Sequence, residues 1–116
     1  MSTFLLSMEG YGPRHNVYVV ELDKAVLHEP KFMKKNPGYV KNKECYYVGA
    51  TGLDPVMRFA KHRDGIKHNV YVQRYGIRLR PELYERYNPM TFDEAEAKEK
   101  WLAEDLRKKG FAVWSA

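Results

Sequence analysis

The chain has 116 residues, 44% of them hydrophobic, and its 20 Lys and Arg against 15 Asp and Glu give a net charge of +5. This length fits one domain with a single core, spanning residues 1–116, and the basic balance favours anionic partners such as nucleic acid. The lone cysteine, Cys45, excludes an intramolecular disulfide and a cysteine-rich zinc site, and it favours a reducing compartment, so a cytoplasmic protein is expected.

Neither a secretory leader nor a membrane span is expected. The apolar segment Phe4–Met8 is too short for the core of a signal peptide and has no basic region before it. No stretch approaches the ~20 apolar residues that cross a bilayer. The sequence therefore predicts no membrane association.

Two strands separated by a basic loop are predicted in the N-terminal half. Residues 16–22 and 44–50 are rich in β-branched and aromatic side chains, and the two strands are expected to pair antiparallel. Residues 23–43 between them contain prolines and a glycine and are predicted to form a loop with a positive face. Its lysines, which either contact phosphate or only solvate the loop, are Lys31, Lys34, Lys35, Lys41 and Lys43.

Helical signals follow the second strand. Asp54 can cap a helix that has Pro55 at its first position and runs to about Arg63. The pentapeptide His-Asn-Val-Tyr-Val occurs at residues 15–19 and again at 68–72, but the flanking sequences share nothing. An internal duplication is therefore not indicated, and the second copy is predicted to be helix or turn.

A strand and a helix are predicted in the C-terminal third. The strand is placed around residues 82–85, with Pro81 at its edge. A capping box, Thr91 with Glu94, opens the last helix, which ends before Gly110. Residues 111–114 are expected to add an edge strand or to pack as a tail.

The last helix carries a carboxylate in its apolar row. Phe92, Ala95, Leu102 and Leu106 keep the 3- and 4-residue spacing of a buried stripe, and Glu99 occupies the remaining position. Burying an ionised carboxylate is costly unless it is paired or coordinates a cation. Glu99 therefore either holds a cation, pairs with a nearby arginine, or reaches solvent at the end of the stripe.

Four further side chains suit phosphate chemistry. Arg58 and His62 are four residues apart and so share a helix face, where a guanidinium can bind phosphate oxygens and an imidazole can relay a proton. Tyr18 and Tyr47 lie in the two predicted strands and could serve as proton acceptors only beside a cation or polarised water. Taken singly, each of these residues is also typical of an ordinary core or surface.

In this order, the residues resemble the GIY-YIG nuclease superfamily. Val17-Tyr18-Val19 stands where the first motif would be, and Tyr47-Val48-Gly49 matches the second. Arg58 and His62 follow at similar offsets, and Glu99 lies in a helix that resembles the metal-binding helix of the family.

The resemblance covers roughly residues 15–112 and departs from the family pattern in three places. Asn16-Val17 replaces the usual Gly-Ile, the basic loop 23–43 is an insertion between the two tyrosines, and no asparagine follows Glu99. The resemblance implies an α/β fold, a small sandwich with a central three-stranded antiparallel sheet flanked by helices.

The resemblance also implies a metal-dependent endonuclease that hydrolyses phosphodiester bonds, in DNA rather than RNA. Glu99 would hold Mg²⁺ or Mn²⁺, and Arg58 would neutralise charge on the phosphoryl oxygens. Tyr18, Tyr47 and His62 would form the proton network, with the general base left open among the three. The insertion would contact substrate, and a protein partner could direct the enzyme to its target. The alternative is a non-catalytic basic module on the same fold that binds nucleic acid or protein.

Overall fold

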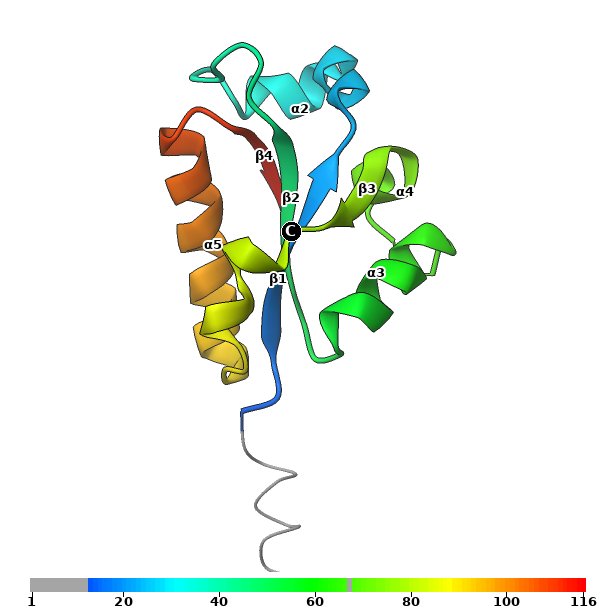
Figure 1. Ribbon diagram of the computed structural model, residues 1–116, viewed down its shortest axis with the longest axis vertical. Coiled ribbons are helices and arrows are strands. Elements are labelled where there is room, and N and C mark those ends of the chain that lie inside the picture. The colour runs from blue at the N-terminus through cyan, green and yellow to red at the C-terminus, as the bar shows by residue number, and fades with distance from the viewer. Residues whose placement is uncertain (1–12, 67) are drawn as a thin grey trace, which may run out of the picture.

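The computed structural model describes residues 13–66 and 68–116, which form a mixed sheet with helices on both faces (Figure 1). The segment Phe4–Met8 considered above lies outside the described residues. The sheet has four strands in the order β3-β1-β2-β4. The α/β class is confirmed; the sheet matches the expectation in part, because β3, β1 and β2 pair antiparallel but a fourth strand, β4, adds in parallel.

The central hairpin agrees with the sequence-based prediction. Strand β1 spans Asn16–Leu22 as predicted, and β2 spans Cys45–Thr51, one residue later than predicted. The two strands pair antiparallel, with Tyr18 opposite Gly49. Most of their side chains are buried because helices cover both faces of the sheet.

Of the outer strands, β3 differs from the prediction, whereas β4 is the edge strand that was one of the two expectations for residues 111–114. Strand β3 is Gly76–Leu79, antiparallel to β1, and β4 is Ala112–Ser115, parallel to β2. The predicted strand around residues 82–85 is absent, because this segment forms two 3-10 turns, η2 (Pro81–Leu83) and η3 (Glu85–Tyr87). Proline lacks the N–H that a strand would donate and its fixed φ suits the start of a helical turn.

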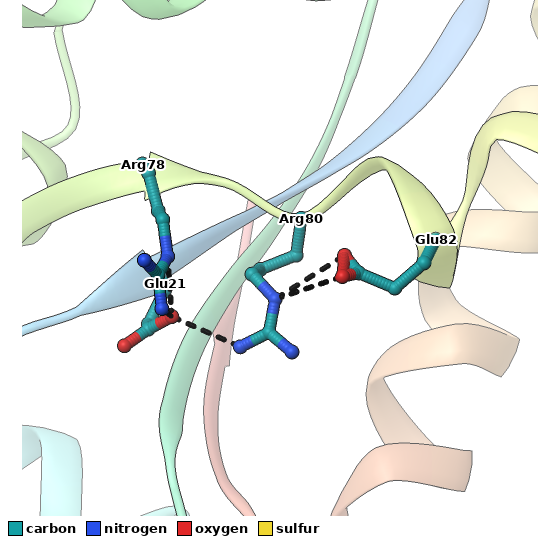
Figure 2. A network of polar contacts seen from close by, with 4 residues as sticks. All are labelled: Glu21, Arg78, Arg80 and Glu82. Atoms are coloured by element: carbon teal, nitrogen blue, oxygen red, sulfur yellow. Dashed lines mark hydrogen bonds and ion pairs between the residues drawn. The ribbon is translucent and has the colours of Figure 1, made fainter.

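Charged side chains fasten β3 to β1. Figure 2 shows Glu21 of β1 between two arginines, with its Oε1 3.0 Å from Nη2 of Arg78 and 2.9 Å from Nη1 of Arg80. Nε of Arg80 also lies 3.2 Å from Glu82. The two pairs with Glu21 join residues almost sixty positions apart, and a contact of this range gives no local sequence signal for the strand.

The insertion is more ordered than the predicted loop. It contains a 3-10 helix, η1 (Lys24–His28), and a short helix, α2 (Pro30–Lys34). Val26 and Phe32 are fully buried in the common core. The insertion is therefore part of the fold, because it covers one end of the sheet with its own apolar side chains.

Two asparagine side chains occupy strand edges that no neighbouring strand covers. The amide of Asn36 accepts from the backbone N–H of Val113 in β4 at 2.7 Å and donates to the carbonyl of the same residue at 3.1 Å. Asn88 makes the equivalent pair with Val17 of β1, at 2.8 Å in both directions. Each amide thus replaces the hydrogen bonds that a further strand would supply.

The longer helices cover the two faces of the sheet. Helices α3 (Pro55–Arg63) and α4 (Val70–Tyr75) lie on one side and α5 (Phe92–Lys108) on the other (Figure 1). Within the described residues, no helix is both long and apolar enough to cross a bilayer. As predicted, the cap of α3 is Asp54, whose side chain accepts from Val56, and α5 opens with a complete capping box.

Candidate functional site

The two tyrosines lie on one face of the central hairpin, under α3. Tyr18 and Tyr47 are 1% and 4% exposed, and their ring centroids are 6.0 Å apart. Gly49 faces Tyr18 across the hairpin, and a Cβ atom at this position would lie 2.6 Å from Cζ and from the hydroxyl of Tyr18. The glycine of the Tyr47-Val48-Gly49 motif is therefore required for space, since any other side chain would displace the phenol.

His62 is the direct partner of Tyr18. It projects from the last turn of α3, is 1% exposed, and its Nε2 lies 2.8 Å from the Tyr18 hydroxyl. Its other ring nitrogen, Nδ1, is 3.0 Å from the backbone nitrogen of Asn69, which begins the cap of α4. Strand β1 and the start of α4 thus hold the imidazole at its two nitrogens.

These contacts determine the tautomer of His62. A backbone N–H can only donate, so Nδ1 must accept from Asn69 and the proton of the neutral ring must sit on Nε2. Nε2–H then donates to the oxygen of Tyr18. Burial, with the charge of Arg58 as a second cause, lowers the pKa of His62 to about 4, so the ring is neutral at physiological pH.

The two phenols are protonated at rest. Burial raises the pKa of Tyr18 far above its ordinary value, and the neighbouring Tyr47 adds to this effect. Burial likewise raises the pKa of Tyr47. The positive charge of Arg58 acts in the opposite direction on both residues. Loss of a proton from Tyr18 thus needs further positive charge or the hydrogen bond from His62.

Glu99 is buried in the row where the sequence placed it. Its side chain is 7% exposed, between the buried residues Ala95 and Leu102 of α5. Phe92, which was expected in the same row, is instead 55% exposed because it lies at the very start of α5. Its ring contacts the ring of His15 edge-on. Glu99 is therefore closer to the exposed end of the stripe than the spacing alone suggested.

Within the part of the chain that the structure describes, the carboxylate of Glu99 has no counter-charge in direct contact. It makes no ion pair and no hydrogen bond with any residue in the ranges 13–66 and 68–116, so the predicted pairing with an arginine is not found. Burial raises its pKa to about 7, and the nearby charge of Glu96 contributes. A desolvated carboxylate of this kind is a candidate cation ligand.

Two neighbouring pockets present Glu99 and Arg58. The first, of about 320 Å³, is lined by Glu99, Glu96 and His15 among others. The second, of about 420 Å³, is lined by Arg58 with Lys61 and Ile66. Thr51, the last residue of β2, lines both pockets. A bound molecule can therefore reach the carboxylate and the guanidinium from one end of the sheet.

The structure gathers all five predicted site residues. Tyr18 contacts His62 directly, and the charges of both Arg58 and Glu99 influence the pKa of Tyr18. Arg58 is half-buried, and its Nη1 lies 3.4 Å from the carbonyl oxygen of Ile66. The arrangement combines a carboxylate for a cation, a guanidinium for an anion and a buried, hydrogen-bonded phenol that senses the charges of both.

The five predicted substrate lysines lie elsewhere. The insertion ends where β2 begins, and the pockets lie at the other end of β2, about 20 Å away for a strand of this length. Lys43 donates to the carbonyl of Lys109 at 2.6 Å and lies over the ring of Phe111. The remaining four, all exposed, are Lys31, Lys34, Lys35 and Lys41.

Sequence reasoning missed several residues around the site. Lys61 follows Arg58 by three positions on α3 and could have been found from helical spacing. His15 precedes the first strand and Thr51 ends the second, so their places follow only from the hairpin register. The role of Asn69 is played by its backbone N–H and carries no sequence signal.

The side chains available as ligands indicate which metal ion the site could bind. Among the described residues, no group of three or more His, Cys, Asp or Glu side chains could hold a metal ion. The pocket that Glu99 lines also presents the carboxylate of Glu96 and the imidazole of His15. Mg²⁺ commonly binds through one or two carboxylates together with waters and substrate phosphates, so the two carboxylates of this pocket fit Mg²⁺ or Mn²⁺.

No protein-family model, curated protein sequence or solved structure matches the chain.

Proposed function

We propose that the protein is a divalent-metal-dependent endonuclease that hydrolyses phosphodiester bonds in nucleic acid, as its resemblance to the GIY-YIG nucleases implies. The observation that carries the proposal is the buried carboxylate of Glu99, which contacts no counter-charge among the described residues and lines a pocket beside that of Arg58. Such a carboxylate is costly in a folded protein that does not use it. A binding module would function as well with an apolar residue there.

Glu99 is the ligand for Mg²⁺ or Mn²⁺ in this proposal. Glu99 would hold the divalent cation, which when bound would supply Lewis-acid stabilisation of the charge on the scissile phosphate and the leaving oxygen. Arg58, at the neighbouring pocket, binds the phosphoryl oxygens and neutralises the charge that develops on them. The two side chains thus bind the phosphodiester from opposite sides of Thr51.

Tyr18 is the best candidate for the proton acceptor. His62 cannot take a proton at Nε2, because its tautomer already places one there, and Nδ1 is occupied by the Asn69 N–H. His62 instead donates to the Tyr18 oxygen, a hydrogen bond that favours the phenolate. Arg58 also favours the phenolate. Because Tyr18 is protonated at rest, it first releases its phenolic proton to solvent; the resulting phenolate orients the attacking water and accepts its proton, while His62 is a positioning residue.

The proposal is tested with purified protein and a panel of single-stranded, duplex and branched DNA and of RNA. We expect cleavage with Mg²⁺ or Mn²⁺ and none in EDTA. Glu99→Gln and Arg58→Ala are each expected to lower the rate by about 100-fold or more. Glu104→Gln, an exposed change on the same helix, is the matched control and should cleave as wild type does.

Two results would count against the proposal. Cleavage by Glu99→Gln at the wild-type rate would refute the role of the carboxylate. Binding of nucleic acid without cleavage of any substrate, in any of the metals, would favour the alternative of a basic binding module. A preference for DNA over RNA is the expected outcome of the substrate panel.

A further inference from the structure

A third pocket, with basic walls, lies at the far end of α5 from the site. It has a volume of about 320 Å³ and lies between the end of α2 and the end of α5. Lys35, Arg107 and Lys108 line it together with the rings of Tyr39 and Phe111. None of the described residues that line it is acidic.

Arg107 is incompletely satisfied in this pocket. Its Nη2 donates to the carbonyl of Val113 at 3.0 Å. Its Nε is the one buried side-chain nitrogen or oxygen, among the residues that the structure describes, without a hydrogen-bond partner. Burial lowers the pKa of Arg107, and the guanidinium forms no ion pair with a described residue. A desolvated cation with unused donors is stabilised by an anion that approaches it.

The walls of the pocket are fixed before any ligand binds. The amide of Asn36 is hydrogen-bonded to Val113 on both sides, which joins the insertion to β4. The backbone of Val40 donates to the carbonyl of Gly110 at 2.9 Å, and Lys43 donates to that of Lys109. The insertion and the end of α5 therefore form one rigid wall, which reduces the entropy lost on binding.

We propose that this pocket binds a backbone phosphate of the nucleic acid whose scissile bond lies at Glu99. The inference rests on the proposed function and locates its second contact. Arg107 supplies the guanidinium donors, and Lys35 and Lys108 supply further positive charge. Of the five lysines that the sequence suggested, only Lys35 lines the pocket, so the structure separates it from the others.

The length of α5 sets the spacing between the two contacts. Glu99 and Arg107 are eight positions apart on one helix, a rise of about 12 Å. Successive nucleotides of one DNA strand rise by about 3.4 Å, so the pocket lies at least three to four nucleotides from the scissile bond. Oligonucleotides too short to span this distance should bind more weakly than longer ones.

The test compares two charge-matched double variants of the full chain in EDTA, where binding is measured without cleavage. Lys35→Glu/Lys108→Glu changes the pocket, while Lys31→Glu/Lys41→Glu makes the same charge change on the insertion outside the pocket. Because all four lysines are exposed, both variants should remain folded, which circular dichroism verifies. The probe is a fluorescein-labelled DNA oligonucleotide, and its affinity is followed by anisotropy across a salt series.

The pocket variant is expected to bind about tenfold more weakly and to lower the slope of log affinity against log salt by about one. The control is expected to lose less than about threefold. In wild type, the Nε–Hε resonance of Arg107 should shift when inorganic phosphate is added at constant ionic strength. It should not shift in the pocket variant.

Equal losses of DNA affinity in the two variants would overturn the proposal. An Arg107 resonance that does not shift when phosphate is added would overturn it as well. A phosphate-sensitive resonance in a protein that binds no DNA would overturn the nucleic-acid assignment. The outcome is separable from that of the proposed function. If the protein cleaves nucleic acid but the two double variants weaken DNA binding equally, only the pocket proposal is refuted. If the pocket variant alone weakens DNA binding but the protein cleaves no substrate, only the proposed enzymatic function is refuted.

Discussion

Replacing Glu99 by glutamine is expected to stabilise the protein above neutral pH. Burial raises the pKa of this carboxyl from 4.5 to about 7. Between these two values the folded chain holds a proton that the unfolded chain has lost, so folding becomes less favourable as the pH rises. The loss of stability begins above about 4.5 and is complete above about 7. Glutamine has nearly the same shape and carries no charge to desolvate.

The magnitude follows from the same pKa difference. A rise from 4.5 to about 7, at 1.36 kcal/mol per pH unit, corresponds to about 3 kcal/mol. At pH 8 in EDTA, Glu99→Gln should therefore have a free energy of unfolding about 3 kcal/mol above that of wild type, and near pH 4 the difference should vanish. Urea denaturation at both pH values, followed by circular dichroism, measures this.

A control variant and the addition of Mg²⁺ distinguish the effect of the buried charge from other effects of the substitution. Glu104→Gln, exposed on the same helix, should change stability by less than about 0.5 kcal/mol at either pH. Mg²⁺ should stabilise wild type in proportion to its binding and leave Glu99→Gln unaffected. A Glu99→Gln protein that is no more stable than wild type at pH 8 would refute the argument that the carboxylate is buried without a partner.

Three further predictions concern the site and the sheet. Gly49→Ala should lower the rate of cleavage and should also lower the free energy of unfolding by about 1–3 kcal/mol, because the added Cβ would lie 2.6 Å from Tyr18. Gly38→Ala is the control: no atom lies within 4 Å of its added Cβ, so the free energy of unfolding measured in urea should not change. Equal losses of stability in the two variants would contradict the steric argument. Asn36→Ala should cost about 2 kcal/mol by leaving buried backbone groups of β4 unpaired, and a change below about 0.5 kcal/mol would show that water replaces the amide. Mg²⁺ affinity, measured by calorimetry, should fall about tenfold per pH unit below about 7 as Glu99 takes up a proton, and a flat profile from pH 5.5 to 7.5 would argue against this ligand.

Features with local signals were predictable from the sequence. The capping box of α5 and the Asp54 cap of α3 are stabilised by residues within three positions of each other, so their sequence spacing is sufficient. Strand β1 was predicted from its β-branched and aromatic run. The burial of Glu99 followed from helical periodicity, which places each side chain relative to its neighbours on the same helix.

Features that depend on distant partners were not predictable. Strand β3 is short and is held by Arg78 and Arg80 against Glu21, a contact that no local pattern encodes. The pentapeptide His-Asn-Val-Tyr-Val shows the same limit. Its first copy, at residues 15–19, enters β1, and its second, at 68–72, caps and begins α4. Identical residues thus take opposite conformations because their neighbours in space differ.

The paired amides of Asn36 and Asn88 limit how other chains can attach to this protein. A strand that approached β4 at Val113, or β1 at Val17, would find the backbone donor and acceptor of that residue already engaged. Growth of the sheet by edge pairing would first require expulsion of an asparagine side chain, and at Asn36 the rupture of the junction with the insertion. Partners are consequently directed to side-chain surfaces, and the sheet is protected at these positions from the strand-to-strand stacking that leads to fibrils.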